Sequence, residues 1–267
     1  HNNLFYMEKE KYKEILYNSW HSSKSEEEPV FKTLEDPWYQ TVMRLLPNLN
    51  GKRVLEIGAG RGDFSIWLAK KYPDATIIGT DFSPSAIQIA TEKSKPLFLN
   101  NLTFEVQNAE SLTYVDNSID YIISCETMEH VFHPNIMAKE MFRVLKNGGG
   151  FILTTENYFN GIILMWLKTW LTGKPFNSGC GVQPHENFFV FFKVANYFKR
   201  AGLKLMHTES NFFQFLLLPK VDPGKLCVKK FNSPFLNKFF KFTKSIFINT
   251  FFRMIKVNIF PRPSYSF

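Results

Sequence analysis

The sequence predicts an α/β fold in which helices cover both faces of a doubly wound, mostly parallel sheet. Two observations support this prediction. Short apolar, β-favouring segments alternate with segments of helical periodicity from residue 53 onward in the 267-residue chain. The first of these strands, Arg53–Ile57, runs directly into a turn with three alternate glycines, and a helical pattern follows at once.

The predicted elements follow one another in a regular order. Two N-terminal helices are expected within residues 8–20 and 36–46, joined by a polar connector. Five strands come next: Arg53–Ile57, Thr76–Asp81, Thr103–Gln107, Ile119–Glu126 and Gly150–Thr155. Helices fill the gaps between them: Asp63–Lys71, Pro84–Lys95 and Asn135–Leu145.

Further elements complete the predicted sheet. A turn is expected at 147–150, and a helix at Val190–Ala201 that ends at Gly202. Leu203–Glu209 and Phe212–Leu218 are interpreted as a closing pair of strands. Together these elements make a seven-stranded, Rossmann-like sheet, in which ligands bind beyond the carboxyl ends of the strands.

Composition and charge divide the chain into three parts. We expect an N-terminal helical cap over 1–50, a central domain over 51–218 with an aromatic-rich insertion at about 158–190, and a tail over 219–267. Residues 223–267 contain nine Lys or Arg and no Asp or Glu, so the net charge of +8 belongs to the tail. The nearly neutral central domain does not resemble an enzyme that binds nucleic acid.

Apolar side chains in the tail recur near helical spacing, with Lys and Arg mostly between them. This pattern predicts an aromatic-rich helical appendage. It lies on an anionic membrane surface, packs on the domain or forms a homodimer contact. No apolar run is long enough to span a bilayer, and the first 28 residues are polar rather than a signal peptide. We therefore expect a cytoplasmic protein, with peripheral membrane attachment as one alternative.

Three glycines at alternate positions, Gly58, Gly60 and Gly62, predict a ligand-binding turn. Glycine allows the main chain to take positive φ angles and allows a ligand to lie against bare backbone. The helix that follows offers free N–H groups to a polar or anionic ligand. A nucleotide-like ligand is therefore expected.

The glycine spacing separates two cofactor classes. The dinucleotide pattern G-x-G-x-x-G fails, because Asp63 occupies the third glycine position. Asp81 lies at the end of the second predicted strand, where an acid accepts hydrogen bonds from ribose hydroxyls in either class. Asp81 alone therefore does not discriminate between a dinucleotide and a sulfonium cofactor.

The ordered motifs resemble those of the class I S-adenosylmethionine-dependent methyltransferases, and most closely their small-molecule branch. They are Glu56-x-Gly58-x-Gly60-x-Gly62, Asp81, Asn108-Ala109-Glu110, Glu129-His130 and the 143–149 segment. The resemblance covers roughly residues 36–218. It implies that the cofactor is S-adenosylmethionine and that the protein is an enzyme that transfers its methyl group.

The resemblance also implies a role for each matched residue. The three glycines would contact the amino-acid part of the cofactor, and Glu56 would hold the turn and help bind the ammonium group. Asp81 would bind the ribose, with Phe82 packing on the adenine. At the adenine edge would lie Asn108, where the family usually has Asp, with Ala109 and Glu110. The methionine side would be lined by Glu126 to His130, and Trp38 with Tyr39 would close over the cofactor.

Candidate bases for the acceptor are His130 and His185, which lies beside Glu186 in a glycine- and proline-shaped loop. His133 is expected to be exposed, and the histidine spacing with unpaired cysteines predicts no metal site. The aromatic segments favour a small or lipid-like apolar acceptor, methylated on a hydroxyl or carboxylate oxygen.

Other acceptors and other functions remain open. N-methylation of a small amine or peptide is the alternative acceptor chemistry. Nucleic-acid base methylation is disfavoured, because Cys125–Glu129 lacks the Asn/Asp-Pro-Pro-aromatic motif of the base amino-methyltransferases. A catalytically silent, membrane-associated interaction module and a dinucleotide-dependent oxidoreductase are the alternatives of other classes.

Overall fold

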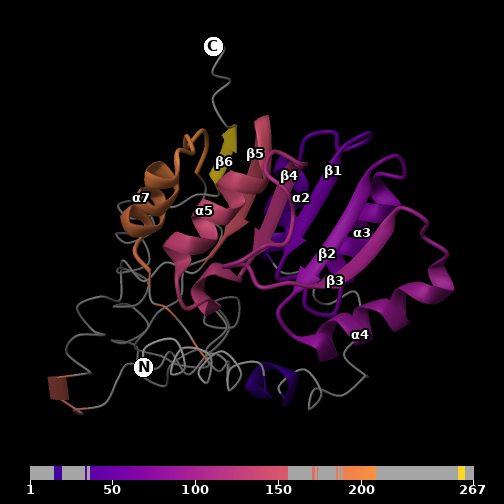
Figure 1. Ribbon diagram of the computed structural model, residues 1–267, viewed down its shortest axis with the longest axis horizontal. Helices are drawn as coiled ribbons and strands as arrows, with labels where there is room; N and C mark the ends of the chain where they lie inside the picture. The colour runs from indigo at the N-terminus through magenta and orange to yellow at the C-terminus, as the bar shows by residue number, and fades with distance from the viewer. Residues whose placement is uncertain are drawn as a thin grey trace, which may run out of the picture.

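The computed structural model describes residues 37–155 and 189–208, the single residues or short segments 15–19, 34, 170–171, 173, 185 and 187, and the main chain of 258–261. Its sheet has the strand order β3-β2-β1-β4-β5-β6 (Figure 1). The first five strands pair in parallel. This confirms the predicted α/β fold with a parallel, doubly wound sheet.

The elements agree closely with their predicted bounds. The strands are β1 (Arg53–Ile57), β2 (Thr76–Asp81), β3 (Leu102–Val106), β4 (Ile119–Cys125), β5 (Leu145–Thr154) and β6 (Asn258–Pro261). The helices are α2 (Pro37–Leu45), α3 (Asp63–Lys71), α4 (Pro84–Ser94), α5 (Pro134–Val144) and α7 (Phe191–Ala201), with short 3₁₀ turns η2 (Lys95–Leu97) and η3 (Met128–His130). In the N-terminal part, residues 15–19 are also helical.

Strand β5 begins earlier than predicted and contains the expected turn as a bulge. Its register against β4 passes from Ile119↔Leu145 to Tyr121↔Gly150, so one residue of β4 lies opposite four of β5. Gly148 has a φ of +75° within this bulge. Lys146 stabilises the bulge, because its Nζ donates to both carboxylate oxygens of Asp120 at 2.9 Å. Such bulges leave the extra residues unpaired, and the pairing resumes beyond them.

The predicted closing strands are not confirmed. Residues 203–208 of the predicted strand Leu203–Glu209 contain only a single bridge residue, His207, so this strand prediction is wrong. Residues 212–218 lie outside the described part of the chain. The edge of β5 is instead paired antiparallel with β6 from the tail, seen in yellow beside β5 in Figure 1.

Each face of the sheet buries its own apolar core. On one face, α2 and α3 pack against side chains of the central strands, as in the contact of Phe64 and Leu68 with Val54 and Ile123. On the other face, α5 and α7 cover the alternate side chains (Figure 1). Phe198 of α7 lies there with its ring centroid 4.8 Å from that of Phe151. Alternation along each strand therefore places the two helical layers, and the carboxyl edge between them is left to the loops.

The glycine turn is required by packing as well as by backbone conformation. Gly62, at the start of α3, has a φ of +80°, and a Cβ there would lie 2.6 Å from the ring of Phe104 and 2.7 Å from Ala90. Gly51 has a similar φ of +72°, but a Cβ there would meet nothing within 4 Å. A side chain at position 51 would therefore meet backbone strain alone, whereas one at position 62 would meet both strain and steric overlap.

We expect Gly62→Ala to lower the free energy of unfolding by about 2–4 kcal/mol, through a strained φ and an overpacked contact. Gly51→Ala carries only the strain and should cost about 1 kcal/mol. Urea denaturation of both variants measures the difference. Equal losses of unfolding free energy in the two variants would contradict this expectation, because the neighbours of Gly62 would then have moved to make room for the added methyl group.

Candidate active site

The glycine turn after β1 is tied to the end of β2. Its three glycines have positive φ angles of 78°, 53° and 80°. The N–H groups of Gly58 and Ala59 both donate to the carbonyl oxygen of Thr80 at 2.8 Å, and Gly60 N–H donates to Asp81 Oδ2 at 2.9 Å. The turn therefore has one fixed conformation before any ligand binds.

A second contact fixes the same turn from the segment after β4. A Cβ on Gly58 would lie 2.1 Å from Thr127 Oγ1, so glycine is required there by the protein itself. The Thr127 hydroxyl donates to the carbonyl of Cys125 at 3.0 Å. Thr127 was not singled out from the sequence, because only the fold brings it against Gly58.

The carboxylate of Asp81, at the end of β2, accepts from two backbone N–H groups. Its Oδ1 accepts from Ser83 N–H and its Oδ2 from Gly60 N–H, both at 2.9 Å. Burial raises the pKa of this carboxyl, while the backbone donors act in the opposite direction. Each carboxylate oxygen has a second lone pair, so two hydroxyl groups can still be accepted. Phe82, the next residue, is half-buried.

Glu56 is buried in the middle of the site, with 1% of its surface exposed. Its carboxylate accepts a hydrogen bond from the Ser65 hydroxyl of α3. Burial raises the pKa of Glu56 to about 7, more than the Ser65 hydrogen bond lowers it. The side chain thus connects β1 to α3. Its role in holding the turn and its contact with an ammonium group stay predictions.

More carboxylates and an aromatic residue surround the turn. Glu126, directly after β4, has a φ of +48°, a conformation that residues other than glycine rarely adopt and that is often found at functional sites. Its N–H donates to Thr154 O at 3.1 Å. The ring of Tyr39 packs at a tilt against that of Phe64, with 4.9 Å between their centroids. Burial raises the pKa of its phenol well above the ordinary value, and nearby Cys125 and the carboxylates of Glu56, Asp63 and Glu126 add to this.

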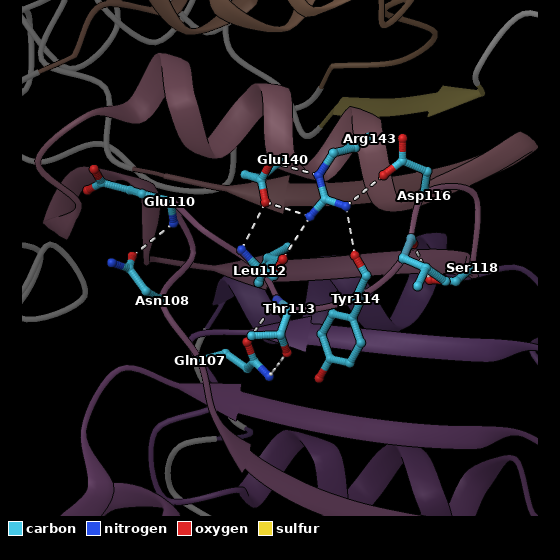
Figure 2. A network of polar contacts seen from close by, with 11 residues as sticks. Gln107, Asn108, Glu110, Leu112, Thr113, Tyr114, Asp116, Ser118, Glu140 and Arg143 are labelled. Atoms are coloured by element: carbon cyan, nitrogen blue, oxygen red, sulfur yellow. Dashed lines mark hydrogen bonds and ion pairs between the residues drawn. The ribbon is translucent and has the colours of Figure 1, made fainter.

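The predicted adenine-edge residues form a tight turn after β3. Asn108 Oδ1 accepts from Glu110 N–H at 2.9 Å. The Glu110 carboxylate points away from Asn108 (Figure 2) and accepts from Phe132 N–H at 2.7 Å and from His133 Nδ1 at 2.6 Å. Glu110 therefore joins this turn to the start of α5, while Ala109 is buried. Contact of these residues with adenine stays a prediction.

Arg143 of α5 clamps the loop that follows this turn, a role that the sequence did not reveal. Its guanidinium donates to the carbonyls of Leu112 and Tyr114 at 2.7 Å and to Asp116 at 2.8 Å (Figure 2). Glu140 pairs with Arg143 at 2.7 Å and accepts from Leu112 N–H at 2.9 Å. These carboxylates raise the pKa of Arg143. The loop therefore has a fixed path along α5.

The two candidate bases, His130 and His185, lie together at the end of β4. His130 Nδ1 lies 2.7 Å from the main-chain oxygen of His185, and its Nε2 lies 3.8 Å from Glu129 Oε1. Glu129 is 1% exposed, and its Oε2 accepts from Thr155 Oγ1 at 2.8 Å. Asn187 binds the main chain of the same segment. The structure therefore brings together residues that are 55 positions apart in the sequence.

His133 caps the start of α5, and its side chain is 43% exposed, as predicted. It pairs with Glu110 rather than with the other histidines. Within the described part of the chain, no cluster of three or more His, Cys, Asp or Glu could hold a metal ion. None of the described helices is long and apolar enough to cross a membrane.

The carboxyl groups around the turn suit a cationic, ribose-bearing ligand. Glu56, Asp63, Asp81 and Glu126 place carboxyl groups around bare main chain at the carboxyl edge of the sheet. The family model described as a methyltransferase domain matches residues 48–181. The chain belongs to this family. Its fold is that of the class I methyltransferases, whose cofactor S-adenosylmethionine carries a positive sulfonium and an ammonium group.

Curated relatives match less than half of the chain. A demethylmenaquinone methyltransferase of Listeria welshimeri is 34% identical over 113 residues, 42% of this chain and 48% of that protein. A ubiquinone/menaquinone biosynthesis C-methyltransferase of Rickettsia akari is 36% identical over 132 residues, 46% of this chain and 53% of that protein. The chain thus spans about half the length of the curated relatives it matches.

Solved structures share the fold at low identity. The protein bound to the Trm112 methyltransferase activator of Haloferax volcanii has a TM-score of 0.63 at 17% identity, covering 96% of this chain and 99% of that one. Geranyl diphosphate C-methyltransferase from Streptomyces coelicolor has a TM-score of 0.57 at 13% identity, covering 84% and 77%.

The buried Glu56 predicts a specific pH dependence of stability. Because its pKa is about 7 in the folded chain and 4.5 ordinarily, the folded state holds this proton more tightly than the unfolded state. The contribution of Glu56 to the free energy of unfolding is therefore largest below pH 4.5, the ordinary pKa of the group. This contribution is lost as pH rises through about 7, its pKa in the folded chain. Without cofactor, Glu56→Gln should remove this decline, gaining about 3 kcal/mol relative to wild type between pH 4.5 and 8. Parallel urea-unfolding profiles for the two proteins would contradict this.

Proposed function

We propose that the protein transfers the methyl group of S-adenosylmethionine to a small, apolar acceptor that carries an ionisable hydroxyl group. The observation that carries this proposal is the position of His130, which follows β4 at the same edge of the sheet as the glycine turn after β1. The pairing of β1 with β4 supports a donor site and a base that lie at the ends of adjacent strands.

In this proposal, different residues bind the cofactor and accept the proton. When bound, S-adenosylmethionine supplies a methyl group already activated by its sulfonium. The main chain of residues 58–62 holds the amino-acid end, Asp81 accepts from the ribose, and the nearby carboxylates favour the positive charge. Tyr39 covers the site from α2. His130 takes the proton of the acceptor hydroxyl through Nε2, which makes the oxygen a stronger nucleophile.

A hydroxylated aromatic ring is the acceptor class that we favour. Removing the hydroxyl proton gives a phenolate, whose negative charge is shared between the oxygen and ring carbons, so the same base serves O- and C-methylation. Oxygen methylation is expected from the sequence, while the relatives of Listeria and Rickettsia are named for quinone substrates, the latter as a C-methyltransferase. N-methylation is less favoured, because a neutral amine needs no base.

The tail is a separate part of the proposal. The main chain of β6 pairs with β5, and this favours a tail that packs at least partly on the domain. The rest of the predicted basic helix lies outside the described residues, so its attachment to an anionic membrane or a second copy stays a prediction.

His130→Gln tests the proposed chemistry, because glutamine retains polarity and volume but cannot take the proton. We expect kcat with S-adenosylmethionine and a hydroquinone- or phenol-type acceptor to fall by about 10²–10⁴-fold. Binding of S-adenosylhomocysteine, measured by calorimetry, should be unchanged. Mass spectrometry and NMR of the product distinguish methyl on oxygen from methyl on carbon.

Two outcomes would contradict the proposal. One is full activity of His130→Gln on an acceptor that the wild type methylates. The other is failure of the wild type to methylate any hydroxylated ring while it methylates amines.

A further inference from the structure

The loop that contains His185 and Asn187 binds the main chain on both sides of His130. We propose that Asn187 is a positioning residue that holds the His185 carbonyl on Nδ1 of His130, so that His130 presents Nε2 as the proton acceptor. His185 then acts through its main chain and not through its imidazole. This inference rests on the proposed function and names further residues of the same site.

Asn187 makes contacts that fix the 129–131 segment. Its main-chain N–H donates to Glu129 O at 2.6 Å. Its side-chain Nδ2 lies 2.6 Å from Val131 O and 3.1 Å from Glu129 O. These carbonyls belong to the residues immediately before and after His130. Asn187 therefore fixes where the backbone of His130 lies relative to the 185–187 loop.

The His185 carbonyl determines which nitrogen of His130 carries the proton. A carbonyl oxygen only accepts, so the 2.7 Å contact requires that His130 Nδ1 donates. In the neutral ring, Nε2 is then the nitrogen that carries no proton. The ring is held within the site, because the His130 side chain is only 15% exposed. Loss of the carbonyl would let the proton move to Nε2 and remove the proton acceptor from that position.

The imidazole of His185 is dispensable for this arrangement. Asn187 Nδ2 also lies 3.1 Å from His185 Nε2, so three acceptors surround a nitrogen that has two hydrogens. Without the imidazole, one hydrogen remains for each of the two carbonyls. The His185 ring packs on Phe132 at a centroid distance of 4.9 Å, which is a contact of a structural side chain. His185→Ala keeps the main-chain carbonyl and therefore separates the two roles.

The experiment compares Asn187→Ala with His185→Ala by ¹⁵N NMR of the imidazole nitrogens at alkaline pH. The His130 signals are identified by their absence in His130→Gln. We expect the Nδ1–H tautomer in the wild type and in His185→Ala, and a mixture of tautomers in Asn187→Ala. In Asn187→Ala, kcat should also fall about 10–100-fold, with the KM for S-adenosylmethionine unchanged, as is typical when the partner that orients a functional histidine is lost.

Asn101→Ala is the matched control. Asn101 Nδ2 also lies 3.1 Å from three main-chain carbonyls, those of Ala69, Tyr72 and Ala75, next to the amino end of β3. Its loss should lower stability to a similar degree while leaving the His130 tautomer and kcat unchanged.

The inference is overturned if Asn187→Ala keeps the wild-type tautomer, if His185→Ala loses it, or if Asn101→Ala changes it as much as Asn187→Ala does. The tautomer is measured without any acceptor. A wild-type chain that shows the expected tautomers but methylates no hydroxylated ring would therefore refute the proposed function alone.

Discussion

The site depends on one constraint: the turn after β1 is held in a left-handed conformation between two neighbouring strands. From β2, Thr80 and Asp81 accept the N–H groups of residues 58–60. From the end of β4, Thr127 fills the space where a side chain on Gly58 would lie. Because both neighbours are strands of one sheet, their ends cannot move independently. The main chain of the turn is therefore held in a fixed position, without a cost of ordering at binding.

Buried carboxyl groups extend this constraint to the rest of the site. Glu56 connects β1 to α3 through Ser65, Glu110 connects the turn after β3 to α5, and Glu129 connects η3 to Thr155 after β5. Each is a polar group that burial would penalise if it had no partner. The same groups make the carboxyl edge of the sheet anionic, which suits a cationic methyl donor. These contacts therefore stabilise the fold at the same edge of the sheet where we propose that the cofactor binds.

Local patterns in the sequence were enough for the parallel sheet and the glycine turn. The bounds of β1, β2 and α3 could be predicted because apolar runs end there in Gly or Asp, whose local conformational preferences are strong. Contacts between distant residues could not be predicted. Examples are Thr127 against Gly58, Asn187 beside His130, and β6 on the edge of β5, since none of these has a signal in local periodicity. For the same reason, two histidines proposed as alternative bases were not expected to contact each other.

Asp81 gives the most direct test of the central claim, because it holds the turn and is proposed to bind the cofactor ribose. Calorimetric titration with S-adenosylhomocysteine should show that Asp81→Ala weakens binding by about 10–100-fold, the loss of hydrogen bonds to a charged group. Glu92→Ala, which removes an exposed carboxylate of α4 that pairs with Lys95, should bind like the wild type. Circular dichroism confirms that both variants are folded. Wild-type affinity in a folded Asp81→Ala protein would contradict the account.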